Sequence, residues 1–184
     1  AAVIMPLGEG ELIEGIDDSK KLKPEERERL AALIRERAIA YKVCEESSET
    51  IDAINILEAT RLCMKRAVEG LAVQPDVVFT DGNFRLQIDL PQQNIVRGDA
   101  LSYTIGAASI LAKVYRDALM CEYDKLYPQY GFAVHKGYGT KRHTDAIREY
   151  GLCEIHRRTF TKKFWEEAES AGEQNTLNPS GTKF

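Results

Sequence analysis

Two aspartates eighteen positions apart lie in settings that suit a metal site. Asp81 closes the apolar, β-branched run 77–80, and Asp99 follows the run 94–97 after a glycine. Such runs predict strands, so each carboxylate is expected where a strand ends. Hard divalent cations take anionic oxygen ligands, and acids on neighbouring strands could hold them. The alternative interpretation is that each aspartate forms a turn or caps a helix.

The spacing of apolar residues predicts an α/β arrangement around one sheet, which must position these acids. Pro24 suits the first turn of a helix, and Thr140 and Gly151 suit the two ends of another. Residues 7–15 are expected to form an exposed hairpin or loop, residues 131–139 a loop, and residues 172–184 a polar flexible tail. The strands are predicted near residues 1–5, 41–44, 77–80, 84–88 and 94–97. The other helices are predicted near residues 54–71, 102–126 and 162–171.

The length and composition exclude some classes of protein. The chain has 184 residues, 43% of them hydrophobic, which suffices for one core and a small appended subdomain. No apolar run approaches the roughly 20 residues that span a bilayer. The four cysteines are dispersed without a C-x-x-C pair, which predicts reduced thiols, no zinc site and a cytoplasmic protein.

The distribution of charge favours a polyanionic partner. The chain carries a net charge of −4, but residues 136–163 hold eight basic and three acidic side chains, a local charge of +5. Local potential governs polyanion binding more than the total charge does. This segment is therefore a candidate duplex-binding surface, although a merely solvated basic surface is the alternative. The three histidines are too scattered for a metal site and are expected to face solvent or phosphate.

Three segments in this order resemble bacterial ribonuclease HII, the type 2 ribonuclease H. They are Asp18-Ser19-Lys20-Lys21-Leu22, the run from Asp99 to Asp117, and the glycine-rich stretch from Gly131 to Thr140. The resemblance covers roughly residues 1–160. It implies a ribonuclease H-like fold, with a mixed sheet flanked by helices and a small helical C-terminal subdomain. The implied divisions are a catalytic domain at 1–139, the subdomain at 140–171 and the tail at 172–184.

The resemblance also implies an activity. In this family four acids hold two Mg²⁺ or Mn²⁺ ions, and Asp81 and Asp99 match the third and fourth. The family hydrolyses the phosphodiester 5′ of ribonucleotides, in RNA/DNA hybrids or singly in duplex DNA, which implies a role in DNA repair. The products carry 3′-hydroxyl and 5′-phosphate ends. We expect a monomeric protein without a membrane partner.

Further residues are expected to contact the substrate. By the resemblance, Ser19 and Lys20 face its backbone, where a hydroxyl and an ammonium can hold one phosphate. Tyr138, between two glycines, resembles the family tyrosine that packs on the sugar beside the ribonucleotide. Arg157 and Arg158 belong to the basic segment and are expected to bind the duplex. For Ser19, Lys20 and Tyr138 an ordinary surface position is the alternative reading.

One family segment has no counterpart in this sequence. The family opens with a strand ending in Asp-Glu-x-Gly-Arg-Gly, which supplies the first two acids. We assign no metal to Asp17, Asp18 or Asp117; the first two are expected to orient the Lys20 loop. The expectation is a longer native enzyme, with the 184-residue chain nearly inactive alone. The alternatives are an inactive fragment, a non-catalytic duplex-binding module or a small-ligand α/β domain.

Overall fold

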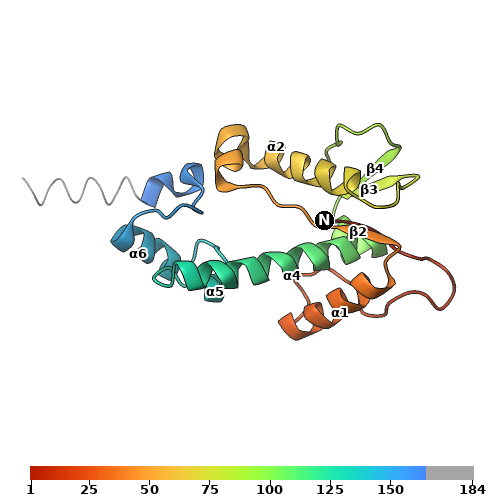
Figure 1. The fold of residues 1–184 in the computed structure, drawn as a ribbon, viewed down its shortest axis with the longest axis horizontal. Coiled ribbons are helices and arrows are strands. Elements are labelled where there is room, and N and C mark those ends of the chain that lie inside the picture. Colours follow the sequence, from red (N-terminus) through yellow and green to blue (C-terminus); the bar gives the residue numbers. More distant parts are fainter. Residues whose placement is uncertain (165–184) are drawn as a thin grey trace, which may run out of the picture. The chain divides into compact units, whose positions relative to one another are not determined.

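The computed structural model describes residues 1–164, which fold into two compact units (Figure 1). The first unit contains residues 1–46 and 54–116, and the second contains residues 47–53 and, of the described chain, residues 117–164. No helix within the described residues is long and apolar enough to cross a membrane. The predicted tail and the end of the predicted helix 162–171 lie outside the described residues. The predicted domain limits at 139 and 171 stay predictions.

The first unit contains most of the secondary structure. Its strands are β1 (Ala2–Ile4), β2 (Ala40–Lys42), β3 (Val78–Asp81) and β4 (Gln92–Ile95). Its helices are α1 (Pro24–Arg37), α3 (Gly98–Leu101) and parts of α2 (Ser48–Glu69) and α4 (Tyr103–Leu126). The predicted start of α1 and both predicted ends of α4, β1 and β3 are confirmed to within two residues.

The strands form two separate sheets instead of the one predicted. β1 pairs with β2 in antiparallel fashion, with Val3 opposite Tyr41, and β3 pairs with β4 in parallel fashion, with Thr80 opposite Asn94. Within residues 1–164, β1 and β3 each pair along one edge only. The prediction of a single sheet is therefore wrong for the described chain. The physical reason is that a cavity lies where β1 and β3 would have to meet.

This inter-strand cavity has a volume of about 570 Å³. It is lined by residues 1–5, which contain β1, and by residues 77–81, which contain β3. Apolar side chains of α2 and α4, among them Val68 and Ile105, also line it. Two strand edges and two apolar helix faces thus border one mostly apolar space.

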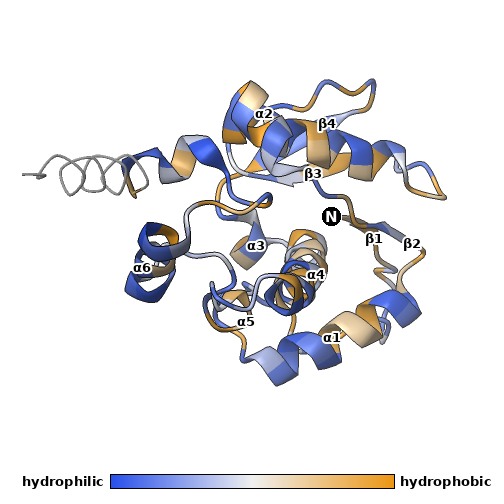
Figure 2. Ribbon diagram, turned by 60° about the vertical axis from the view of Figure 1, so that its left-hand side comes forward, coloured by the Kyte–Doolittle hydropathy of each residue, from blue (hydrophilic) through white to orange (hydrophobic). Residues whose placement is uncertain are grey.

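The core of the first unit lies between α1 and α4. Leu30 and Ile34 of α1 are fully buried, as are Ile110 and Leu111 of α4, and the four belong to one cluster. Each large apolar side chain buried in this way contributes roughly 1.5–3 kcal/mol. Figure 2 shows both helices with hydrophobic and hydrophilic residues on the same ribbon, as expected for helices with one buried face. This packing provides the scaffold for the segments before α1 and α4.

Residues 84–88 do not form the predicted strand. Their alternation of apolar and polar residues is real, and Leu86 is buried. The Leu86 N–H, however, donates to Gln92 Oε1 at 2.8 Å, and Gln92 Nε2 donates to the Leu86 carbonyl at 3.0 Å. A side chain therefore satisfies the backbone groups that a neighbouring strand would have taken. Strand β4 itself begins at Gln92, two residues before its predicted start.

Helix α2 begins at Ser48, earlier than the predicted start near residue 54. Its axis is interrupted at Asn55, whose φ of 65° and ψ of 165° are not helical. The Asn55 Oδ1 accepts hydrogen bonds from the N–H groups of Leu57, at 3.0 Å, and Glu58, at 3.2 Å. Asn55 therefore caps a second helical stretch. The predicted helix corresponds to that second stretch.

The second unit packs short helices around an aromatic core. It contains the end of α4, α5 (Phe132–His135), α6 (Lys141–Tyr150) and helical residues 158–164. The predicted ends of α6 are confirmed, because Thr140 Oγ1 accepts from the His143 N–H and Gly151 follows with a φ of 76°. The predicted loop 131–139 instead contains α5. The core of the second unit comprises Met120, Tyr130, Phe132, Ala146 and Ile147.

Candidate metal centre and nucleic-acid interface

Asp81 is the last residue of β3, as predicted, and the first residue of α3 fixes its carboxylate. Asp81 Oδ1 accepts a hydrogen bond from the Gly98 N–H at 2.8 Å. A Cβ on residue 98 would lie 2.6 Å from Ile105 Cδ1 and 3.5 Å from the Asp81 Cα. Glycine at position 98 therefore lets this backbone come close enough to hold Asp81.

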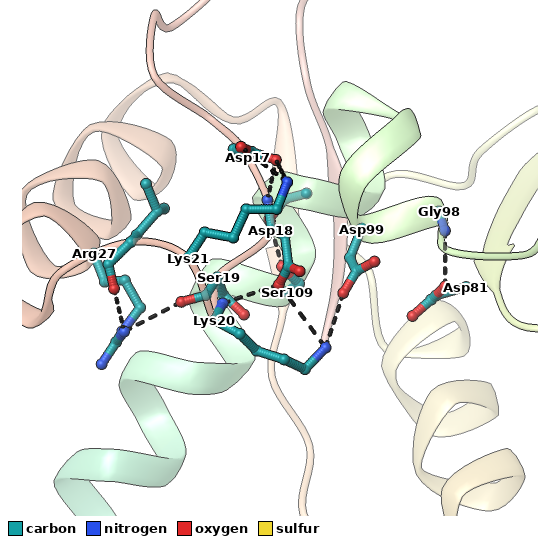
Figure 3. Close-up of polar contacts among 12 residues, drawn as sticks. Asp17, Asp18, Ser19, Lys20, Lys21, Arg27, Asp81, Gly98, Asp99 and Ser109 are labelled. Carbon is teal, nitrogen blue, oxygen red and sulfur yellow. Dashed lines mark hydrogen bonds and ion pairs between the residues drawn. The ribbon is translucent and has the colours of Figure 1, made fainter.

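Asp99 does not lie at the end of a strand, contrary to the prediction. Strand β4 ends at Ile95, and Asp99 is the second residue of the short helix α3. Arg97, with a left-handed φ of 59°, turns the chain between the two elements. The turn leaves Asp99 buried next to Gly98, whose N–H holds the Asp81 carboxylate. Figure 3 shows the side chains of Asp81 and Asp99 as neighbours.

Lys20 brings a positive charge to this pair of acids. Its Nζ lies 3.0 Å from Asp99 Oδ2 and 3.8 Å from Asp18 Oδ1 (Figure 3). The hydrogen bond to Asp99 is the main cause that raises the pKa of Lys20 above its usual 10.5, with smaller contributions from the charges of Asp18 and Asp81. The Lys20 side chain is still 75% exposed. It therefore bridges the buried carboxylate and solvent.

The loop that carries Lys20 is held by local polar contacts. Asp17 Oδ1 accepts from the Asp18 N–H at 2.7 Å, and Asp18 Oδ1 accepts from the Lys20 N–H at 2.9 Å. The prediction that Asp17 and Asp18 orient this loop is confirmed. Ser19 is buried, at 5% exposure, and its carbonyl accepts from Arg27 Nη1 at 3.1 Å. The loop is thus anchored to α1 through Arg27.

The donor set at this site fits part of a magnesium or manganese centre. Mg²⁺ in proteins is often held by one or two carboxylates, with water and substrate phosphate as the other ligands. Asp81 and Asp99 supply carboxylates of this kind. Among residues 1–164, no cluster of three or more His, Cys, Asp or Glu side chains is placed to hold a metal. Asp81 also lines the inter-strand cavity, together with Ser109 of α4.

The remaining predicted contacts belong to the second unit. Tyr138 is 65% exposed and follows Gly137, which has a φ of 80°. The Arg157 guanidinium lies 4.1 Å from the centroid of the Phe160 ring. Arg158 is exposed, and its backbone N–H donates to Asp52 Oδ2 at 2.7 Å. The structure thus groups Asp81, Asp99, Ser19 and Lys20 in one unit, and Tyr138, Arg157 and Arg158 in the other.

Part of the basic segment is neutralised by ion pairs within it. Lys141 and Arg148 both contact Asp145, three or four positions away on α6. These pairs lower the pKa of Asp145, chiefly through the hydrogen bond from Lys141.

The expectation that the histidines face solvent or phosphate is wrong. His135, His143 and His156 are all buried, because their rings pack against one another and against the edge or tilted face of the Phe132 ring. Sequence reasoning missed the burial of the histidines and the contact of Lys20 with Asp99. Lys20 and Asp99 are 79 positions apart, so no local pattern connects them.

The fold class follows from likeness to a solved structure. The crystal structure of the ribonuclease H2 from Pyrococcus horikoshii matches with a TM-score of 0.69 and 24% sequence identity, over 89% of this chain and 83% of the other. This likeness shows the ribonuclease H2-like fold, an α/β arrangement of mixed strands and helices.

Sequence comparison shows the family. The family model described as Ribonuclease HII matches residues 1–168. Ribonuclease HII of Pelodictyon phaeoclathratiforme is 49% identical over 87% of this chain and 80% of its own length. The chain belongs to the ribonuclease HII family of metal-dependent endoribonucleases.

Other relatives are longer. Ribonuclease HII of Acetivibrio thermocellus is 50% identical over 89% of this chain, and that of Desulfitobacterium hafniense DCB-2 is 54% identical over 79%. The chain spans 63% of the length of the first of these relatives and 56% of the second.

Proposed function

We propose that this protein hydrolyses the phosphodiester on the 5′ side of ribonucleotides, in RNA/DNA hybrids or singly in duplex DNA. The observation that carries the proposal is that the N–H of Gly98, the residue directly before Asp99, holds the Asp81 carboxylate, with the Lys20 ammonium on Asp99. Hydrolysis would leave 3′-hydroxyl and 5′-phosphate ends. We infer a monomeric cytoplasmic enzyme with a role in DNA repair.

The chemistry assigns a role to each of these side chains. Asp81 and Asp99 would hold Mg²⁺ or Mn²⁺, and two bound ions would supply an activated water and charge stabilisation for the leaving oxygen. The Gly98 N–H keeps one Asp81 oxygen fixed, so its other oxygen keeps a defined direction. The exposed ammonium of Lys20 would contact a substrate phosphate. A point charge suits this role because it tolerates several phosphate orientations. Ser19 is buried as the structure stands, so its predicted phosphate contact would require the loop to move.

The recognition of the ribonucleotide is assigned to the second unit. The Tyr138 ring is exposed on a turn and would pack on the sugar next to the ribonucleotide, where a 2′-hydroxyl distinguishes RNA from DNA. Arg157 and Arg158 would contact phosphates of the duplex. Their contribution is expected to be independent of sequence, because phosphate contacts position a protein without reading bases.

The two acids need further ligands, and we propose that a strand in the inter-strand cavity supplies them. β1 and β3 each border this cavity, and each has one edge without a strand partner among the described residues. An apolar strand added there would pair with both edges, as in β-augmentation. Carboxylates at its end would lie near Asp81, which lines the same cavity. The family segment ending in Asp-Glu-x-Gly-Arg-Gly has this chemistry.

A peptide-complementation experiment tests the strand. The 184-residue chain is titrated with Mn²⁺, alone and with a synthetic apolar strand that ends in Asp-Glu-Ala-Gly-Arg-Gly. Tighter Mn²⁺ binding with this peptide is expected, and a peptide ending in Asn-Gln instead should bind without that gain. If the acidic peptide leaves Mn²⁺ affinity unchanged, the proposed completion of the site is wrong.

Substitution of the two acids tests the activity in the form that binds metal. Asp81→Asn and Asp99→Asn should each abolish Mg²⁺-dependent cleavage of a duplex with one ribonucleotide, because charge is lost while the side chain keeps its size. Asp89→Asn changes an exposed acid of the same unit and is the matched control. Wild-type turnover by either variant would contradict the metal assignment.

A second candidate function is duplex binding without cleavage. It is favoured by the small number of metal ligands among the described residues and by the net charge of +5 over residues 136–163. A module of this kind would bind an RNA/DNA hybrid equally well in EDTA and in Mg²⁺. It would also cleave no substrate when the strand peptide is present.

A further inference from the structure

The three histidines of this chain form a buried row in the second unit. His135 lies at the end of α5, His143 in α6 and His156 before the helical residues 158–164. Their exposures are only 7%, 6% and 6%. The rings of His135 and His143 stack with centroids 4.4 Å apart, and those of His143 and His156 lie 5.3 Å apart.

Two of these histidines contact the turn that presents Tyr138. The Gly137 N–H donates to His135 Nδ1 at 3.2 Å, and His143 Nδ1 lies 3.0 Å from the Tyr138 carbonyl. The turn also contains Lys136, whose φ of 53° is left-handed. This conformation is costly for a residue with a side chain and needs surrounding contacts to hold it. The histidines provide such contacts from the buried side, while the Tyr138 ring stays exposed.

We propose that the histidines are positioning residues for Tyr138: His135 and His143 hold the backbone of its turn, and His156 supports His143. This inference rests on the proposed function, in which Tyr138 contacts the sugar beside the ribonucleotide. The three buried histidines would thus affect substrate recognition through the backbone of the exposed Tyr138.

The hydrogen bonds require one arrangement of protons. A carbonyl can only accept, so His143 Nδ1 carries a hydrogen and donates it to Tyr138, and His143 Nε2 of the neutral ring accepts. His156 Nε2 lies 3.1 Å from that nitrogen and must donate. His156 Nδ1 then accepts from the Cys153 N–H at 2.9 Å. His143 is thus supplied with a donor on one side and an acceptor on the other.

The same reasoning fixes the third ring. His135 Nδ1 accepts from Gly137, so His135 Nε2 carries the hydrogen and donates to the Tyr130 carbonyl at 2.8 Å. All three rings must therefore be neutral for the network to form. The groups that act on them are one another, the Arg157 charge, the Cys153 thiol at 3.0 Å from His156 Nδ1, and Tyr130. Burial is the main cause that lowers the pKa of His143 and lowers the pKa of His156 to about 4, and the neighbouring charges act in addition.

Nitrogen NMR of the histidine rings tests the arrangement directly. The chain has only three histidines, so ¹⁵N-histidine labelling gives three ring systems in the full-length protein. At pH 7 the hydrogen is expected on Nδ1 of His143 and on Nε2 of His135 and His156. A hydrogen on Nε2 of His143, or a protonated ring at pH 7, would overturn the proposal.

Paired substitutions test the effect on Tyr138. His143→Asn keeps a donor near the Nδ1 position, whereas His143→Leu removes it at similar size. In His143→Leu, amide hydrogen exchange at residues 137–139 should become faster by a larger factor than in the rest of the second unit. In His143→Asn, most of the protection at residues 137–139 should be retained. Equal exchange at residues 137–139 in Leu and wild type would overturn the proposal. If the Leu variant does not fold, the Asn variant and the ring spectra decide.

A double-mutant cycle separates this inference from the proposed function. The measured quantity is the ratio of affinities for a ribonucleotide-containing duplex and an all-DNA duplex, in EDTA. Tyr138→Ala should reduce the ratio roughly fivefold to tenfold, the lower range for aromatic stacking. His143→Leu should reduce it similarly, and the double variant no further, because both act through one ring. Independent, multiplying losses would overturn the positioning role. No loss with Tyr138→Ala would contradict the proposed function instead and leave the NMR result standing.

Discussion

The Nζ atom of Lys20 lies 3.0 Å from Oδ2 of Asp99, across 79 positions of sequence. An ammonium thus occupies one oxygen of a carboxylate that is a candidate metal ligand. Lys20 and a bound cation would compete for Asp99. The same contact keeps the Lys20 loop next to the acids, where a substrate phosphate would also have to lie.

Replacing Lys20 should therefore affect metal and substrate in opposite directions. In Lys20→Met, Mn²⁺ binding should tighten several-fold, because a unit charge at about 4 Å is worth about 1 kcal/mol at the dielectric of water. Duplex binding should weaken through the lost phosphate contact. Calorimetric titration with Mn²⁺ and anisotropy with a duplex measure the two effects. Lys21→Met is the control, since Lys21 pairs with Asp17 instead. Weaker Mn²⁺ binding in Lys20→Met would contradict the competition.

Gly98→Ala should disturb the site through one identifiable contact. The new Cβ would lie 2.6 Å from Ile105 Cδ1, and overpacking of this kind costs about 1–3 kcal/mol. Ile105→Val removes the Cδ1 atom and alone costs about 0.5–1.5 kcal/mol. The double variant should be more stable than the sum of the two costs predicts. Urea unfolding of the three variants measures the coupling, and strictly additive costs would place the strain elsewhere.

Duplex binding should weaken steeply with salt if the basic segment contacts phosphates. With three to five contacts, the slope of log K against log salt should be about −2.7 to −4.5, at about 0.9 per contact. Arg157→Glu with Arg158→Glu should flatten the slope. Lys141→Gln should change it less, because Lys141 already pairs with Asp145. An unchanged slope in the double variant would mean that the binding face lies elsewhere.

Acid should loosen the second unit before the first. His143 and His156 have pKa values below the usual 6.5 in the folded chain, that of His156 at about 4, so the unfolded chain binds more protons between these values. The stability from the neutral rings is present above about pH 6.5 and is lost as the pH falls toward 4. The loss for His156 is on the order of 3 kcal/mol, at about 1.4 kcal/mol per pKa unit.

Hydrogen exchange between pH 7 and pH 4.5, corrected for the intrinsic rate, checks this acid effect. Protection in α6 should fall while protection in α1 is kept. His156→Gln, which keeps a donor at the Nε2 position and does not titrate in this range, should flatten the dependence. An equal loss of protection in both helices would contradict a local histidine effect.

Much of the secondary structure could be predicted because its signals are local. Pro24 with the acids of the first turn starts α1, and Thr140 and Gly151 limit α6, each through contacts within one helical turn. The position of Asp81 at a strand end was likewise predictable from the run before it. Asp99 was not, because a left-handed Arg97 starts a helix where the pattern predicted a strand.

The sequence by itself determined the helices of the core, the acids of the site and the family resemblance. The tertiary structure decided how distant groups meet. Residues 84–88 alternate like a strand, yet a Gln92 side chain satisfies the backbone at Leu86. Lys20 meets Asp99, and three separated histidines form one buried row. Periodicity and capping act over a few residues, whereas these contacts depend on which segments the packing of α1, α4 and the short helices brings together.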